Sequence, residues 1–128
     1  MSQENVDAVL RVIDEANEGT FGRRFNALFD PAVEFRDELG SLNNRDDLLR
    51  YIDSYRESFG GFRVEVEDVR DLGSSVLVRI LQGGRGTTSG IDIDQHFTWV
   101  MTFDGDRCIR WHIYADHGKA LDAAGLSE

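Results

Sequence analysis

Cysteine is nearly absent from this sequence, since Cys108 is the only one among 128 residues. A single cysteine cannot form a disulfide within the chain, so the fold must be stabilised without one. Cys108 falls within an alternating pattern that is typical of a β-strand. We therefore expect a small, partly buried thiol there.

Basic residues are also scarce. The chain has 14 Lys and Arg against 24 Asp and Glu, which gives a formal net charge of -10. This balance repels phosphate backbones, and the basic residues form no cluster that would hold an anionic membrane. We expect no nucleic acid and no membrane among the partners.

Long apolar runs are missing as well. No stretch approaches the length that spans a bilayer, and the N-terminal segment is acidic and amphipathic, unlike a signal peptide. These features predict a cytoplasmic protein.

The residues that are present are typical of a globular protein. Hydrophobic residues make up 41% of the chain and aromatic residues 10%, enough for one core. No internal repeat or linker divides the sequence, so we expect a single domain over residues 1–128.

Helical periodicity marks the first half of the chain. One predicted helix stops at Gly19, a short second one closes at Asp30-Pro31, and a third is capped by Asn44 and ended by Gly60-Gly61. Their apolar stripes are Val6, Val9, Leu10, Ile13 and Ala16; Phe21, Phe25, Leu28 and Phe29; and Leu48, Ile52, Tyr55 and Phe59.

The period then changes to two, which indicates strands. Strands are predicted around 62–67, 76–81, 91–103 and 109–115, and a short last helix over 119–124 is capped by Asp116. The strand at 76–81 is apolar on both faces. The run Gly83-Gly84-Arg85-Gly86 lies between strands, so it indicates a flexible hairpin or bulge and not a phosphate loop.

The last two strands form a hairpin whose register can be predicted. Their apolar faces must coincide, so odd positions should oppose odd positions across a three-residue turn at 104–106. The predicted pairs are Trp99 with Trp111, Phe97 with Ile113, Gln95 with Ala115, Thr98 with His112, and His96 with Tyr114.

Helices first and antiparallel strands afterwards predict an α+β fold. We expect a cone-shaped barrel in which three N-terminal helices pack on a strongly curved mixed or antiparallel sheet and leave a cavity. The outer face of the sheet would suit a homodimer through Val76, Val78 and Ile80 beside Val100 and Tyr114.

Asp37 is the first candidate for chemistry. It alternates with Val33 and Phe35 on the face expected to point inward, and a carboxylate in an apolar interior is costly unless it is paired, protonated or used. Arg79 and Gln95 are predicted on the same inward face. Aromatic and aliphatic walls would come from Phe35, Phe97, Trp99, Trp111 and Ile113.

These residues favour an enzyme that needs no cofactor and transfers a proton on a small hydrophobic molecule. Asp37 would be the base, with Gln95 and Arg79 as polar positioners. The alternative is a structural pair in which Asp37 and Arg79 neutralise each other. The protein would then be a non-catalytic ligand-binding or dimeric assembly module.

A second group of polar residues falls on the opposite face of the last strands: Asp94, His96, His112, Tyr114 and Asp116. Histidines and carboxylates on neighbouring strands can bind a transition metal or shuttle protons. No metal-binding spacing supports that interpretation, so we expect no metal and favour a half-polar outer face at a subunit contact.

Two segments resemble a known family. The run from Ala27 to Glu34, continued by Asp37-Glu38-Leu39-Gly40-Ser41, and the run from Tyr114-Ala115-Asp116 to Ala123-Ala124-Gly125-Leu126 are similar to the SnoaL-like group. This group belongs to the nuclear-transport-factor-two-like superfamily, which implies the cone fold over nearly the whole chain.

Within the superfamily, the local match to ketosteroid isomerase implies that Asp37 is a general base. The chain departs from that enzyme at both oxyanion partners, which correspond to about Val12 and to Gln95 ahead of His96-Phe97.

Other relatives match less well. Trp111 resembles a tryptophan of limonene epoxide hydrolase, but Ile113 replaces an aspartate of that enzyme. In the polyketide cyclases, the acid/base aspartate corresponds most nearly to Asp116.

Overall fold

A computed structural model describes residues 2–19 and 23–126 of the chain. Within these residues the helices are α1 (Ser2–Asn17), α2 (Arg23–Leu28), α3 (Arg45–Glu57) and α4 (His117–Ala123). The strands are β1 (Phe29–Asp37), β2 (Gly40–Leu42), β3 (Phe59–Asp71), β4 (Ser75–Gly86), β5 (Asp92–Asp104) and β6 (Arg107–Tyr114). None of the helices in this described part has the length and apolarity that a membrane crossing requires.

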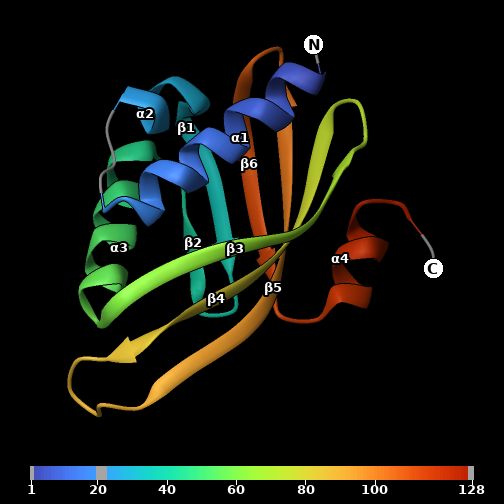
Figure 1. The fold of residues 1–128 in the computed structure, drawn as a ribbon. Coiled ribbons are helices and arrows are strands. Elements are labelled where there is room, and N and C mark those ends of the chain that lie inside the picture. Colours follow the sequence, from blue (N-terminus) through green and yellow to red (C-terminus); the bar gives the residue numbers. More distant parts are fainter. Residues whose placement is uncertain (1, 20–22, 127–128) are drawn as a thin grey trace.

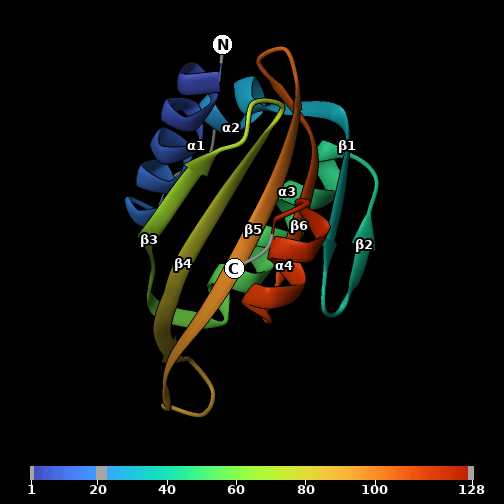
Figure 2. The same ribbon diagram turned by 90° about the vertical axis from the view of Figure 1, so that its right-hand side faces the viewer.

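The strands form one mixed, strongly curved sheet in the order β2-β1-β6-β5-β4-β3. Neighbouring strands are antiparallel except β1 and β6, which run parallel. Helices α1, α2 and α3 lie on one side of the sheet, and α4 lies on the other (Figures 1 and 2). The predicted α+β cone is confirmed, with an open sheet.

The third predicted helix shows how local sequence sets an element. The Oδ1 atom of Asn44 accepts a hydrogen bond from the backbone N–H of Asp47 at 2.8 Å, which satisfies a donor that the first turn would leave unpaired. Asp116 caps α4 in the same way, through the N–H of Lys119 at 3.1 Å. Both predicted caps are confirmed.

Two apolar clusters hold the fold together. The larger lies between α1–α3 and the sheet and contains residues from every element of that layer, including Val9, Phe25, Leu48, Ile80 and Trp111. The smaller lies on the other face, where Ala120 and Leu121 of α4 cover Leu77 and Val100. The sheet is therefore buried on both sides along β4 and β5.

Several predicted boundaries differ from the structure. Phe29, predicted in the second helix, is the first residue of β1, and Asp30 and Pro31 continue that strand. Phe21, assigned to the same helix, lies outside the described residues. The strand β4 extends through the glycine-rich run to Gly86, and the bulge lies opposite it in β3, between Gly60 and Arg63.

In the predicted β5–β6 register, odd-numbered residues correctly oppose odd-numbered residues, but the individual pairs are wrong. Trp99 pairs with Ile113, and Met101 pairs with Trp111. The strands pair up to Asp104 and Arg107, and the shift between Thr102 and Phe103 leaves Ile109 as an extra residue in β6. Between this bulge and the turn, the even-numbered residue of β6 points into the core in place of the odd-numbered one. Cys108 is therefore fully buried, while Ile109 is 37% exposed.

The two faces of β4 are the reverse of those predicted. Val76, Val78 and Ile80 are fully buried in the core under the helices, and they cannot form an outer interface. Val100 and Tyr114 pack in the cluster under α4. The proposed dimer surface is therefore wrong in its residues, while the homodimer itself stays a prediction.

Candidate functional site

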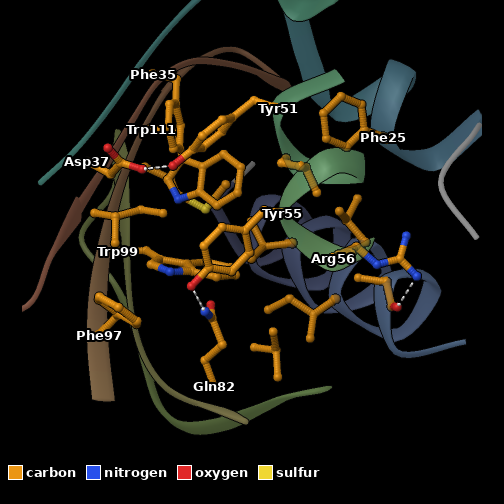
Figure 3. Close-up of a pocket in the computed structure, with 18 of the residues that line it drawn as sticks. Phe25, Phe35, Asp37, Tyr51, Tyr55, Arg56, Gln82, Phe97, Trp99 and Trp111 are labelled. Atoms are coloured by element: carbon orange, nitrogen blue, oxygen red, sulfur yellow. Dashed lines mark hydrogen bonds between the residues drawn. The ribbon is translucent and has the colours of Figure 1, made fainter. Parts of the chain in front are cut away.

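A cavity of about 310 Å³ lies between the three N-terminal helices and the curved sheet (Figure 3). Its lining is mainly apolar and unusually rich in rings: Phe25, Phe29, Phe35, Tyr51, Tyr55, Phe62, Phe97, Trp99 and Trp111. The residues predicted as its walls, Phe35, Phe97, Trp99, Trp111 and Ile113, all line it.

Trp111 lies at the centre of the aromatic packing. Its ring centroid is 5.0 Å from that of Trp99 and 5.1 Å from that of Phe35, both in edge-on geometry, and 5.3 Å from that of Phe29, which is stacked. These offset and edge-to-face contacts are the favourable arrangements of aromatic rings. They fix the orientation of the wall on β5 and β6.

Asp37, at the end of β1, lines the same cavity. Its Oδ1 atom accepts hydrogen bonds from the backbone N–H groups of Leu39 at 2.8 Å and Gly40 at 3.1 Å, which closes the turn into β2. Its Oδ2 atom accepts a hydrogen bond from the Tyr51 hydroxyl at 2.5 Å. The carboxylate is therefore held by β1, the turn and α3 together (Figure 3).

Two tyrosines of α3 face the sheet across the cavity. Burial raises the pKa of Tyr51, and its hydrogen bond to Asp37 raises it further. Burial also raises the pKa of Tyr55, although a hydrogen bond from Gln82 opposes this shift. Both phenols therefore keep their protons at neutral pH.

Two amide side chains, those of Gln82 and Gln95, also line the cavity. Gln82 Nε2 donates to the Tyr55 hydroxyl oxygen at 2.8 Å, and Gln82 pairs with Gln95 across β4 and β5. Gln95 lines the cavity from an exposed position, so it lies at the mouth. Its predicted place on the pocket face agrees with the structure, and its chemical role stays a prediction.

Arg79 does not belong to the site. It is exposed and lies on the face of β4 opposite Val78 and Ile80, so its predicted inward position is wrong. The structural pair of Asp37 with Arg79 is wrong for the same reason. The prediction failed because β4 is apolar on both faces, and hydrophobicity alone could not choose between them.

Sequence reasoning missed Tyr51 and Gln82. Tyr51 is three residues after Leu48 and four before Tyr55, so its spacing along α3 already placed it beside the predicted apolar stripe. Gln82 continues the alternation of Val78 and Ile80, and it would have been found had that face of β4 been chosen.

Both tryptophans carry a buried polar atom without a partner. The side chains of Trp99 and Trp111 are each 7% exposed, and neither indole Nε1 has a hydrogen-bond acceptor in the described part of the structure. Buried donors are normally paired, so two unpaired ones on one cavity wall are unusual.

The second polar group does not gather at one site, although the rings of His112 and Tyr114 are in edge-on contact with centroids 6.5 Å apart. His112 Nε2 lies 2.7 Å from Glu34 Oε2, His96 Nδ1 lies 2.7 Å from Glu67 Oε1, and Asp94 approaches Arg63 at 4.0 Å. Asp116 serves as the cap of α4. Over residues 2–19 and 23–126, no three His, Cys, Asp or Glu side chains come together as a metal site would need.

The profile of the SnoaL-like domain matches residues 9–111. No curated protein matches the chain significantly.

Solved structures with the same fold are numerous. A proposed SnoaL-like polyketide cyclase from Jannaschia sp. CCS1 aligns with a TM-score of 0.81 at 19% identity, over 99% of this chain and 95% of the other. AclR from Streptomyces galilaeus, described as a proposed hydroxylase, aligns with a TM-score of 0.78 at 13% identity, over 98% of both chains.

A third neighbour, TerC, was co-crystallised with polyporic acid. It aligns with a TM-score of 0.76 at 14% identity, over 95% of this chain and 98% of the other. At such identities these structures establish the fold and not the activity. Since the profile covers most of the chain, the protein belongs to the SnoaL-like domain family.

Proposed function

We propose that the protein binds a small hydrophobic ring compound in this cavity and catalyses a proton transfer on it without a cofactor, as an isomerase or cyclase does. The observation that carries this proposal is the position of Asp37, an oriented carboxylate on the wall of an aromatic cavity. Apolar walls with a few fixed polar groups are typical of small-molecule sites.

The two oxygens of Asp37 have different hydrogen-bond partners. Oδ1 is committed to the turn by two backbone N–H groups, whereas Oδ2 accepts one hydrogen bond, from Tyr51. Each carboxylate oxygen has two acceptor positions, so Oδ2 keeps one for a substrate proton. Oδ2 would take a proton from a carbon of the bound compound and return it to the same or another atom.

The relatives are consistent with such a ligand. One neighbour is described as a proposed polyketide cyclase, and another was crystallised with polyporic acid. The nine rings that line this cavity would suit a flat, apolar compound.

A proton-exchange assay tests the proposal. The probe is 2-tetralone, a two-ring ketone with acidic C–H bonds, incubated with the protein in D2O and followed by NMR. The wild type is expected to accelerate exchange of the protons next to the carbonyl, and Asp37→Asn to lose at least about 100-fold of that acceleration. The asparagine can still accept the hydrogen bonds of Leu39 and Gly40.

The matched control is Asp71→Asn. Asp71 Oδ1 accepts from the N–H of Gly73 at 3.0 Å in an exposed hairpin, so the same substitution is made in a similar turn outside the cavity. Its exchange rate should equal that of the wild type. Equal rates for Asp37→Asn and the wild type would contradict the proposed role of Asp37.

The second candidate is a ligand-binding protein without catalysis. It is favoured by the two backbone hydrogen bonds that already give Asp37 a structural role in the β1–β2 turn, and by the third hydrogen bond, which ties it to Tyr51 of α3. This alternative predicts that 2-tetralone binds while its exchange rate stays at the background value in every variant.

A further inference from the structure

The amide of Gln82 and the hydroxyl of Tyr55 form a polar pair on the mainly apolar cavity lining. Gln82 Nε2, on β4, donates to the Tyr55 oxygen, on α3, at 2.8 Å, so the pair joins two walls of the cavity (Figure 3). Both side chains are half-buried. Within the described residues, the Tyr55 proton has no acceptor, and the Gln82 Oε1 atom accepts no hydrogen bond and is not fully buried.

The pair offers one donor and one acceptor whichever way the amide lies. In the orientation above, Tyr55 keeps its O–H proton and Gln82 keeps Oε1. With the amide turned over, Tyr55 donates to Oε1, and the Gln82 N–H groups and a Tyr55 lone pair are left instead. Burial raises the pKa of Tyr55, so its proton stays in place at neutral pH. A group that both accepts and donates a hydrogen bond therefore matches this pair.

A small hollow beside the main cavity gives this pair room for one more group. It has a volume of about 10 Å³ and shares Tyr55, Phe62, Gln82 and Gln95 with the lining of the main cavity. Such a volume holds about one water molecule. A hydroxyl group of a ligand is of that size, whereas a carboxylate or a methoxy group is larger.

The charges nearby favour a neutral group in the hollow. Asp37 and Glu38 line the same cavity and would repel an anion. Arg56, also on the lining, donates to the carbonyl oxygen of Ala16 at 3.2 Å and lies 3.9 Å from Asp53. Its charge is therefore already engaged by α1 and α3. A phenolic hydroxyl is uncharged at neutral pH and needs no counter-ion.

The pair lies about one helical turn from the acid/base group. Tyr51, which donates to Asp37, and Tyr55 are four residues apart on α3, with ring centroids 6.3 Å apart. A ligand that reaches both places needs a ring between its reacting carbon and its hydroxyl group. In 6-hydroxy-2-tetralone the hydroxyl lies across the aromatic ring from carbon 1, the acidic carbon next to the carbonyl group, a separation of similar length.

We propose that Tyr55 and Gln82 form a subsite that binds a hydroxyl group of the substrate, so that the substrate class is a ring ketone with a hydroxyl on the ring remote from the ketone. The ligand oxygen accepts a hydrogen bond from one member of the pair, and the ligand O–H donates to the other. The proposal rests on the function proposed above and adds the group that orients the substrate toward Asp37.

Three compounds of one ring system test the subsite: 6-hydroxy-2-tetralone, 6-methoxy-2-tetralone and 2-tetralone itself. Their affinities for the wild type are measured by isothermal titration calorimetry. The hydroxyl compound should bind about tenfold more tightly than 2-tetralone, the effect of roughly one net hydrogen bond. The methoxy compound should bind no more tightly than 2-tetralone, because it has no proton to donate and its methyl group does not fit the hollow.

Conservative variants assign the effect to the pair. Tyr55→Phe and Gln82→Leu each remove one polar group and keep a side chain of similar size. Either should reduce the preference for the hydroxyl compound to within about twofold, while the affinity for 2-tetralone changes little. The matched control is Tyr114→Phe, which removes a hydroxyl from the cluster under α4 and should keep the tenfold preference. The wild-type affinities test the proposal even if a variant does not fold.

Other outcomes overturn it. Equal affinities of the wild type for 6-hydroxy-2-tetralone and 2-tetralone would exclude the subsite, as would the absence of binding by all three compounds. A preference that survives in both cavity variants, or that the methoxy compound shares, would exclude it too. Failure of the acid/base proposal looks different: the preference for the hydroxyl compound is then present, but the bound ketone does not exchange its protons in D2O.

Discussion

The carboxylate of Asp37 is held by donors of two kinds. Backbone N–H groups fix Oδ1 as part of the β1–β2 turn, and the Tyr51 hydroxyl on α3 fixes Oδ2. Because both the β1–β2 turn and α3 hold this carboxylate, its position depends on how the two elements pack together. Its orientation toward the cavity is therefore a property of the packed molecule and not of the strand.

Tyr51→Phe is expected to separate the contribution of the Tyr51 hydroxyl from that of the backbone N–H groups. It removes the O–H that donates to Asp37 at 2.5 Å and keeps the ring, whose centroid is 5.6 Å from that of Phe35. The free energy of unfolding should fall by about 1–2 kcal/mol, measured by urea denaturation. In an Asp37→Asn background the same substitution should cost clearly less, because the charged acceptor is already gone. Equal costs in both backgrounds would show that the two side chains are not coupled.

Glu34 predicts a pH effect on stability. The hydrogen bond from His112 lowers the pKa of Glu34 below its ordinary value of 4.5, and the charge of Arg110 acts in the same direction. A lowered folded-state pKa contributes stability above the unfolded-state value and loses it as the pH falls through the folded-state value. The free energy of unfolding of the wild type should therefore fall below about pH 4.5 more steeply than that of Glu34→Gln.

The control for this experiment is Glu65→Gln, at an exposed position of β3. Urea denaturation at several pH values should give this variant the same slope as the wild type. If Glu34→Gln also keeps the wild-type slope, the contact with His112 does not influence acid stability.

At the scale of elements, the glycine-rich end of β4 has a packing role. A Cβ atom at Gly84 would lie 3.0 Å from the Cβ of Phe59 and 3.3 Å from the Cα of Phe62, across the bulge of β3. The two phenylalanines are packed against Tyr55, with ring centroids at 5.2 and 6.0 Å. The absence of a side chain at Gly84 therefore lets the bulge approach, and the bulge supports a tyrosine of the cavity.

Gly84→Ala should destabilise the protein by about 1–3 kcal/mol, because the added methyl group forces the aromatic cluster to move. Gly60→Ala is the matched control, since its Cβ would meet only Arg85 O at an ordinary distance of 3.9 Å. Thermal or urea denaturation would measure both. A cost for Gly84→Ala no larger than that for Gly60→Ala would show that the close approach is easily relieved.

Periodicity in the sequence was sufficient to predict the helices, the strands other than β2, the caps of α3 and α4, and the aromatic part of the cavity wall on β5 and β6. The helix caps at Asn44 and Asp116 and the inward aromatic row on β5 depend on local rules. The β5–β6 pairs were two residues off for two reasons: the turn between Asp104 and Arg107 has two residues and not the predicted three, and the bulge at Ile109 inserts one more residue that periodicity does not reveal.

The contents of the site were harder to predict. Asp37 and Gln95 could be placed by alternation, whereas Arg79 could not, since both faces of its strand are apolar. The contact of Tyr51 with Asp37 joins α3 to β1 through tertiary packing. Such a contact has no local signal, so it required the structure.

For the whole molecule, the sheet separates two apolar layers that serve different purposes. The layer under α1–α3 contains the cavity, and the layer under α4 is a compact cluster around Leu77 and Leu121. A hydrogen bond at 2.8 Å between Thr98 Oγ1 and His117 Nδ1 also fixes the start of α4 to β5. Damage to the second layer should therefore reduce stability without changing the cavity.

Leu121→Ala tests this separation. Leu121 is 3% exposed, so its truncation should cost about 2–5 kcal/mol of unfolding free energy. The affinity of the folded protein for 2-tetralone should stay that of the wild type. Ile91→Ala, at a residue 62% exposed, should cost much less. A large loss of affinity in Leu121→Ala would mean that α4 supports the site through the sheet.

The strand order has a consequence for how the protein is made. β1 and β2 come early in the chain, yet their link to the rest of the sheet is the parallel pairing of β1 with β6, near the C-terminal end. Pairing over such a separation is slow, because a long loop must close before any contact forms. A nascent chain without residues 107–114 has neither Trp111 nor the strand with which Phe35 and Arg36 pair. The cavity is thus completed only after residues 107–114 have been synthesised.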